Sequence, residues 1–257
     1  MNIYVCIKQV PDTETKIKLK PDSTWIDTTG IKWIMSPYDE FAVEEALQIK
    51  AKNAGSTITA VCAGPARVQE TIRTALAMGC DHGIHIDLPE NADCFMAAKA
   101  IAGVLGKEAK VDVVYTGKEA IDDGAAQTSQ LIASLMGIPC VTVALKADIA
   151  GTKVTCQREI EGGAFEIVES SLPAVIAAQK GMNKPRYASL PEIMKAKKKE
   201  IKTIPMSDAG VAPTDMKIKV AKLELPPPKQ AGKKIAGEPA AQAQNLAKLL
   251  REEAKVI

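Results

Sequence analysis

The chain has 257 residues, of which 46% are hydrophobic and 25% are charged, a balance typical of a folded globular protein and not of a disordered one. Its 33 Lys and Arg residues nearly cancel its 31 Asp and Glu residues, so it lacks the basic excess of a nucleic-acid-binding protein. No apolar run approaches the ~18 residues of a membrane helix, and the apolar start at residues 3–7 predicts a first strand, not a signal peptide.

Apolar, β-branched segments alternate with helical patterns over residues 3–136. Strands are predicted at residues 3–7, 57–63, 83–87 and 111–116, and helices at residues 37–53, 66–78, 94–108 and 128–136. Continuous apolar strands are typical of strands buried on both faces. The alternation therefore predicts an α/β protein with a mostly parallel sheet flanked by helices.

The pattern changes beyond residue 140. Residues 141–148, 153–161 and 165–170 predict a meander of polar-alternating strands with a Gly162-Gly163 turn, and the apolar residues 172–178 return to the core. A basic run at residues 194–199 and three prolines at 226–228 follow, and a last amphipathic helix is predicted at about residues 239–255. Residues after about 200 therefore resemble an extended arm, not a self-contained domain.

The six cysteines and two histidines argue against a metal centre. No two cysteines form a CxxC pair, so an iron–sulfur cluster or a zinc ribbon is disfavoured, and a reducing, cytoplasmic compartment is expected. His82 and His85 are interpreted as a loop pair near a strand and not as metal ligands.

A loop rich in Gly, Ala and polar residues, 117–128, follows the strand at 111–116 and leads into a helix. Ligands of open α/β sheets bind at such strand ends, and the N-terminus of a helix favours an anion. Gln127 and Thr128 can add donors, whereas Asp122 and Asp123 would repel a phosphate unless their carboxylates cap the loop. The alternative is a plain strand–helix loop with a threonine cap.

Known catalytic and nucleotide motifs do not occur in the sequence. The loop matches neither GxxxxGK[ST] nor GxGxxG, and the chain has no GxSxG or HExxH motif. Any redox chemistry would therefore come from a cofactor, and a self-contained catalyst is not expected.

Several long motifs resemble, in order, those of the β (small) subunit of electron-transfer flavoproteins. They are VCIKQV at 5–10, SPYDE at 36–40, AVEEA at 42–46, ETIRTALAMG at 70–79, GKEAIDD at 117–123, REIEGG at 158–163, NKPRYASLP at 183–191 and IMKAK at 193–197. The resemblance implies an adenine-nucleotide α-hydrolase-like fold and a heterodimer with a larger α subunit. It also implies an FAD held mainly by that α subunit, and an AMP in the β core.

The resemblance implies cofactor-binding residues at positions that match the family motifs. They are Cys6, Ser36 and Ala63 on the adenine side, Ala120, Asp123, Gln127 and Thr128 on the phosphate side, and Tyr38 beside them. Two positions depart from the AMP-binding pattern: Ala126 stands where relatives tend to carry Asn, and Thr13 where they tend to carry Tyr.

The resemblance also implies an electron carrier that serves acyl-CoA dehydrogenases, as in fatty acid oxidation, and a downstream oxidoreductase. The implied partner-binding residues are Glu159, near the flavin domain of the α subunit, and Leu190, Ile193 and Met194, which dock on the dehydrogenase. The expected regions are a nucleotide-binding α/β domain at 1–185, a partner-recognition segment at 186–200, and an arm and helix packing on the α subunit at 201–257.

Two alternatives remain open from the residues. Residues 10–13, VPDT, look more like the electron-bifurcating branch, in which the β subunit holds a second FAD in place of AMP and oxidises NADH. A stand-alone adenine-nucleotide-binding protein is the other alternative, although a proline-rich arm with little core of its own is better explained by a partner.

Overall fold

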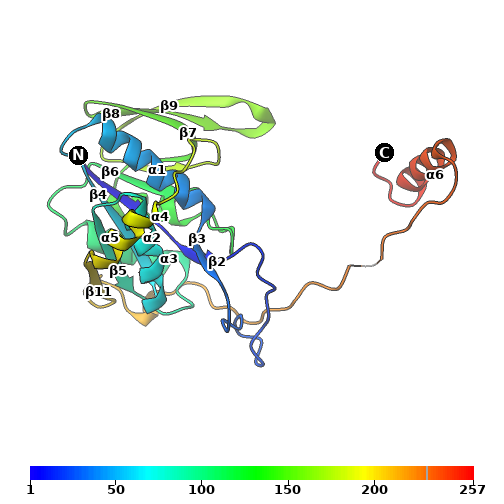
Figure 1. Ribbon diagram of the computed structural model, residues 1–257, viewed down its shortest axis with the longest axis horizontal. Helices are drawn as coiled ribbons and strands as arrows, with labels where there is room; N and C mark the ends of the chain where they lie inside the picture. The colour runs from blue at the N-terminus through cyan, green and yellow to red at the C-terminus, as the bar shows by residue number, and fades with distance from the viewer. Residues whose placement is uncertain (230) are drawn as a thin grey trace. The chain divides into compact units, whose positions relative to one another are not determined.

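The computed structural model describes residues 1–229 and 231–257 (Figure 1). They form two compact units. The first contains Met1–Lys18 and Asp27–Ala221, and the second contains Leu19–Ile26 and Lys222–Ile257.

The first unit is built on a nine-stranded sheet with the order β11-β5-β4-β1-β6-β10-β7-β8-β9 (Figure 1). Seven neighbouring strands are parallel: β11 (Ile201–Pro205), β5 (His82–Asp87), β4 (Thr57–Gly64), β1 (Asn2–Cys6), β6 (Val113–Gly117), β10 (Val175–Ala178) and β7 (Cys140–Ala150). The sheet continues with β8 (Lys153–Glu159), antiparallel to β7, and with β9 (Phe165–Ser171), antiparallel to β8. The predicted mostly parallel sheet with a polar meander is thereby confirmed.

Helices cover both faces of the sheet, and β1 shows how the core is divided. Ile3 and Val5 pack with α1 (Pro37–Lys52), α2 (Gln69–Met78) and Ala196 of α5 (Leu190–Lys198). Tyr4 and Cys6, which point to the opposite face, pack with α3 (Cys94–Leu105) and α4 (Thr128–Met136). Because successive side chains of a strand alternate between faces, a continuous apolar strand such as β1 requires a helix layer on each side.

Some predicted boundaries differ from those of the structure. The helix at 128–136 is confirmed to the residue, but the segment predicted as a helix at 66–78 begins with a 3₁₀ turn, η1 (Ala66–Val68), before α2. His82 and His85 lie in β5 and not in a loop, and the buried His85 places Nε2 2.8 Å from the carbonyl oxygen of Gly64.

The arm begins later than the sequence suggested. Residues 201–205, expected in the arm, form the edge strand β11, which pairs with β5 from Ile201 to Pro205. A proline is tolerated at the end of such an edge strand because no neighbour needs its missing N–H group. The first unit also contains a short antiparallel pair, β2 (Gln9–Pro11) and β3 (Trp33–Met35), and two 3₁₀ turns, η2 (Glu161–Gly163) and η3 (Pro213–Asp215).

In its described residues, the second unit contains a short turn, an irregular segment and one helix. The turn Leu19–Ile26 is closed by a bridge between Leu19 and Ile26, and the N–H of Leu223 donates to the carbonyl oxygen of Ser23 at 2.8 Å. The predicted last helix is present as α6 (Pro239–Glu252). Among the described residues, no helix combines the length and the apolar character needed to cross a membrane.

Candidate functional site

The strand order reverses at the carboxyl ends of β1 and β6, which is the position of the ligand-binding crevice in open α/β sheets. From β1 the chain passes to β4 and β5 on one side, and it then returns to β6 on the other side of β1. In open α/β sheets, ligands bind outside the carboxyl ends of the strands where the order reverses in this way. Cys6, the last residue of β1, and Gly117, the last residue of β6, therefore mark the candidate site.

Asp39, in the first turn of α1, joins the two strand ends. Its Oδ2 accepts the backbone N–H of Lys8 at 2.7 Å, and its Oδ1 accepts the backbone N–H of Gly117 at 2.9 Å. A Cβ atom at Gly117 would lie 2.5 Å from Asp39 Oδ1 and 2.7 Å from the Cβ of Tyr38. Glycine is therefore required at Gly117 for α1 to approach the end of β6 this closely.

Burial favours the protonated forms of three side chains near this edge of the sheet, those of Asp39, Cys62 and Cys6. Burial raises the pKa of Asp39 to about 7, although its two backbone hydrogen bonds and the ammonium of Lys8 favour the charged form. Burial likewise raises the pKa of the Cys62 thiol to about 12, and that of the Cys6 thiol further still. These two cysteines are therefore protonated at neutral pH and behave as small apolar side chains.

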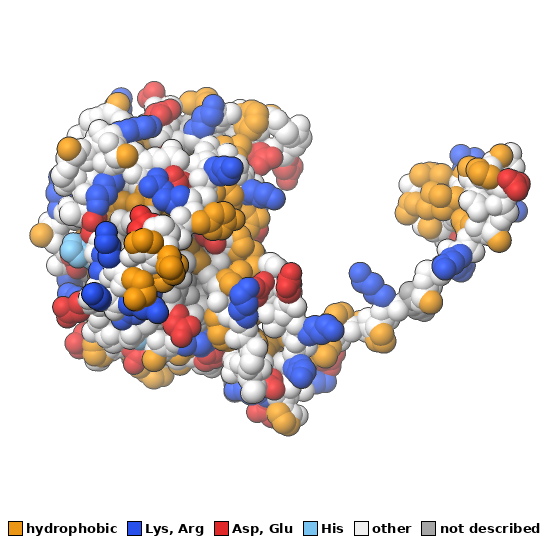
Figure 2. Space-filling view, in the orientation of Figure 1, with side chains coloured by type: hydrophobic (Ala, Val, Ile, Leu, Met, Phe, Trp, Pro, Cys, Tyr) orange, Lys and Arg blue, Asp and Glu red, His pale blue; other side chains and the backbone are white. Residues whose placement is uncertain are grey.

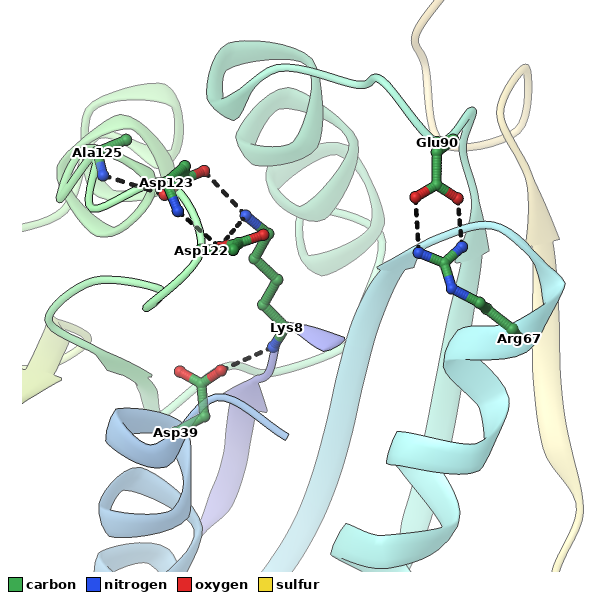
Figure 3. Close-up of polar contacts among 7 residues, drawn as sticks. All are labelled: Lys8, Asp39, Arg67, Glu90, Asp122, Asp123 and Ala125. Atoms are coloured by element: carbon green, nitrogen blue, oxygen red, sulfur yellow. Dashed lines mark hydrogen bonds and ion pairs between the residues drawn. The ribbon is translucent and has the colours of Figure 1, made fainter. Parts of the chain in front are cut away.

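Two carboxylates in the loop between β6 and α4 accept hydrogen bonds from N–H groups of the same loop. Asp122 Oδ1 accepts the N–H of Asp123 at 3.0 Å, and Asp123 Oδ1 accepts the N–H of Ala125 at 3.0 Å. The same two carboxylates receive the ammonium of Lys8, at 2.9 Å from Asp122 and 2.8 Å from Asp123 (Figure 3). Their negative charge is therefore partly compensated within the loop and partly by Lys8.

The N-terminus of α4 lies next to the end of β6. Thr128 is the first helical residue and Gln127 occupies the N-cap position, so the alternative of a threonine cap is wrong. Within the described chain, no side chain caps this helix end, whereas Ser129 holds it against β6 through a 2.8 Å contact between its Oγ and Thr116 Oγ1. Uncapped N–H groups at a helix start favour an anion.

The sequence-predicted cofactor residues lie on the elements that end or begin at this edge. Cys6 lies in β1 and Ala63 in β4, and Ser36 and Tyr38 lie at the start of α1. The other predicted residues lie between the end of β6 and the first turn of α4: Ala120, Asp123, Gln127 and Thr128. Ser36 is fully buried, and its Oγ has no hydrogen-bond partner in the described structure. A buried hydroxyl without a partner is costly, so a polar ligand atom is expected there.

Sequence reasoning missed three residues at this edge, namely Lys8, Asp39 and Arg67. Arg67 forms a bidentate ion pair with Glu90 (Figure 3), and its guanidinium lies 3.8 Å from the centroid of the Trp33 ring. Their partners lie far away in sequence, so no local pattern indicates these contacts. The available signal was position alone, because a lysine directly after the first strand must reach the edge where ligands bind.

The predicted partner-recognition segment is a short helix with an exposed apolar surface. In α5, Leu190 is 74% exposed, Met194 53% and Ile193 39%. Figure 2 shows hydrophobic side chains over α5 with Lys and Arg side chains around them. The competing prediction, that these residues pack into the core of this chain, is wrong.

Ion pairs and hydrogen bonds hold α5 at both ends. Before the helix, the guanidinium of Arg186 pairs with Glu44 of α1 at 2.7 and 2.9 Å. At its end, Nη1 of Arg73 from α2 donates to the carbonyl oxygens of Ala196, Lys197 and Lys199 at 3.0–3.3 Å. The exposed apolar residues are therefore presented on a fixed helix.

Glu159 ends β8 and is exposed. Its Oε2 accepts Nε2 of Gln179 at 3.1 Å, while the neighbouring Arg158 pairs with Glu166 at 3.2 Å. Among the described residues, no Lys or Arg forms an ion pair with the Glu159 carboxylate, which lies exposed at the end of β8.

Comparisons with known proteins agree with this architecture. Residues 23–209 match the family model described as "Electron transfer flavoprotein domain". The chain is 42% identical to the electron transfer flavoprotein subunit beta of Bacillus subtilis, with all of both chains covered. It is 45% identical to the protein of the same name from Mus musculus, and the matched region covers 91% of this chain and 92% of the mouse protein. It is 42% identical to that of Syntrophomonas wolfei, with 100% and 98% covered.

Proposed function

Because the chain belongs to the electron transfer flavoprotein family, among its β subunits, we propose that it is the small subunit of a heterodimeric electron carrier. The carrier accepts electrons from acyl-CoA dehydrogenase-type flavoenzymes, as in fatty acid oxidation, and passes them to a downstream oxidoreductase. The observation that supports this role best is α5, whose exposed Leu190 and Met194 stand beside Lys195, Lys197 and Lys198. A few exposed apolar side chains with a basic rim suit a short-lived complex with an acidic partner.

We propose that the crevice at the β1–β6 edge holds an adenine nucleotide, AMP. The unpartnered Oγ of buried Ser36 supplies a polar group for the base, with Cys6, Tyr38 and Ala63 beside it. On the phosphate side stand Ala120, Asp123 and the uncapped start of α4 with Gln127 and Thr128. AMP is not redox-active, so its proposed role is to complete the core of the subunit.

Electron transfer in the proposal depends on an FAD held mainly by the α subunit, which supplies the redox chemistry when bound. This chain contributes contacts to that partner. Glu159, exposed at the end of β8, is proposed to face an arginine of the flavin domain, and α6 with its exposed Leu246 is proposed to pack on the α subunit. The six unpaired cysteines suit a reducing, cytoplasmic compartment.

The nucleotide site is tested by Thr128→Val, with Gln127→Leu as a second variant. Each change removes a donor at the start of α4, and a hydrogen bond to a charged group contributes about 1.5–3 kcal/mol. We therefore expect each variant heterodimer to retain less AMP after gel filtration, while its melting temperature stays near that of the wild type.

Thr128→Ser is the matched control, because it keeps the hydroxyl, and its AMP content should equal that of the wild type. Unchanged AMP content in Thr128→Val with a lowered melting temperature would contradict the assignment, since Thr128 would then serve the helix alone.

A further inference from the structure

Hydrogen bonds hold the backbone of Ile7 and Lys8 just after the end of β1. The N–H of Ile7 donates to the carbonyl oxygen of Val61 at 2.9 Å, and the N–H of Lys8 donates to Asp39 Oδ2 at 2.7 Å. The carbonyl oxygen of Lys8 accepts the N–H of Ser36 at 2.9 Å. The side chain of Lys8 therefore starts from a rigid point just after the end of β1.

The ammonium of Lys8 reaches the middle of the loop between β6 and α4. It contacts Asp122 Oδ1 at 2.9 Å and Asp123 Oδ2 at 2.8 Å, and Figure 3 shows the side chain spanning from the end of β1 to the loop. The other hydrogen bonds of these two carboxylates stay within the loop, to the N–H groups of Asp123 and Ala125. Lys8 thus ties a loop that is otherwise anchored at its two ends.

The loop has features of a segment that opens easily. Ala126 adopts a φ of +50°, a left-handed conformation that is unfavourable for alanine. The side chains of Lys8 and Asp123 are each 42% exposed, and ion pairs this accessible contribute little to global stability. Breaking these pairs would therefore free the loop without unfolding the chain.

The charges of the group matter for an anionic ligand. Lys8, Asp122 and Asp123 together carry one negative charge, whereas without Lys8 the two carboxylates would present two negative charges near the start of α4. Those carboxylates would repel a phosphate bound at the same loop. Lys8 thus closes the loop and also reduces the repulsion that the loop itself would exert.

We propose that Lys8 is a latch residue, which holds the loop of residues 118–127 closed and so controls how slowly the crevice releases its adenine nucleotide. The inference rests on the proposed nucleotide site. Lys8 acts here as a positioning residue through Asp122 and Asp123, and no direct contact with the nucleotide is required.

The test compares Lys8→Met with Lys8→Arg in the purified heterodimer loaded with radiolabelled AMP. Methionine keeps much of the side-chain length and removes the charge, so we expect three- to tenfold faster exchange against excess unlabelled AMP, with a melting temperature near that of the wild type. Arginine keeps the charge and should exchange within twofold of the wild type. Salt from 0.05 to 0.5 M should accelerate exchange more in the wild type than in Lys8→Met, which lacks the ion pairs that salt would weaken.

Amide hydrogen exchange of residues 118–127 gives a readout that does not depend on the nucleotide. Faster exchange of these amides in Lys8→Met supports the latch, and unchanged exchange overturns it whatever the crevice holds. Unchanged or slower AMP release in Lys8→Met also overturns the inference and leaves the nucleotide site standing. A wild-type heterodimer that binds no AMP would instead refute the proposed function.

Discussion

Replacing Gly117 with alanine is expected to lower the stability of the heterodimer more than any other single change at the crevice. The new Cβ would lie 2.5 Å from Asp39 Oδ1, 2.7 Å from the Cβ of Tyr38 and 2.9 Å from its carbonyl carbon. Relief requires α1 to move away from β6, which breaks the hydrogen bond between Gly117 and Asp39. Overpacking and this lost bond together predict a loss of about 2–4 kcal/mol in the free energy of unfolding.

Thermal unfolding measures the stability loss of Gly117→Ala. A loss of this size lowers the melting temperature by roughly 5–10 °C in a chain of this length. Gly232→Ala is the matched control, because a Cβ there meets nothing within 4 Å and should change stability by no more than about 0.5 kcal/mol. If the two variants unfold at the same temperature, the contact of Asp39 with both strand ends does not hold the crevice together.

Leu190→Ala is expected to have the largest effect on electron transfer. Leu190 is 74% exposed, so its removal leaves no cavity in the chain, whereas a docking partner would lose an apolar anchor. Central anchors of this kind are worth about 2 kcal/mol or more on truncation. We therefore expect kcat/KM for flavin reduction by an acyl-CoA dehydrogenase to fall by at least about tenfold.

Leu135→Ala on α4 is the control for this variant, since it truncates another exposed leucine of the same unit. Its reduction kinetics should match those of the wild type, and the flavin content and melting temperature of Leu190→Ala should be unchanged. A drop of several degrees in the melting temperature of Leu190→Ala with intact reduction would show that Leu190 supports the fold and not the partner.

Much of the fold was predictable because its strands are buried on both faces. Apolar runs such as residues 57–63 and 111–116 are typical of central parallel strands, and β4 and β6 lie where those runs predicted. β11 was not predicted because Lys202 and Thr203 interrupt its apolar residues, a pattern that suits an edge strand but does not distinguish it from a loop. The short pair β2–β3 was not predicted because each strand has only three residues.

The helix α5 carried a local signal that sequence reasoning did not use. Ser189 and Glu192 form a capping box, in which the N–H and the Oγ of Ser189 donate to Glu192 Oε2 at 2.8 and 2.7 Å. That spacing, with Pro191 in the first turn, is a helix-start signature. The position of α5 on the molecule, by contrast, depends on Glu44 and Arg73, which lie more than 100 residues earlier in the chain.

The candidate site was predictable as a loop but not as a set of contacts. The glycine- and alanine-rich sequence after residue 116 indicated a loop at the carboxyl end of a strand, and such a loop does connect β6 to α4. Family resemblance supplied the candidate residues on it. The roles of Asp39 and Lys8 follow from contacts that span 78 and 114 residues, between Asp39 and Gly117 and between Lys8 and Asp122. Only the folded sheet brings these groups together.

The nucleotides bound to the purified heterodimer decide between a carrier with AMP in its small subunit and a bifurcating enzyme with a second FAD. Denaturing the complex formed with the α subunit releases its bound nucleotides, which chromatography then identifies and quantifies against protein. We expect one FAD and one AMP per heterodimer, with AMP content reduced in Thr128→Val. Two FAD molecules and no AMP would contradict the proposed function and would identify this chain as a subunit of the electron-bifurcating branch.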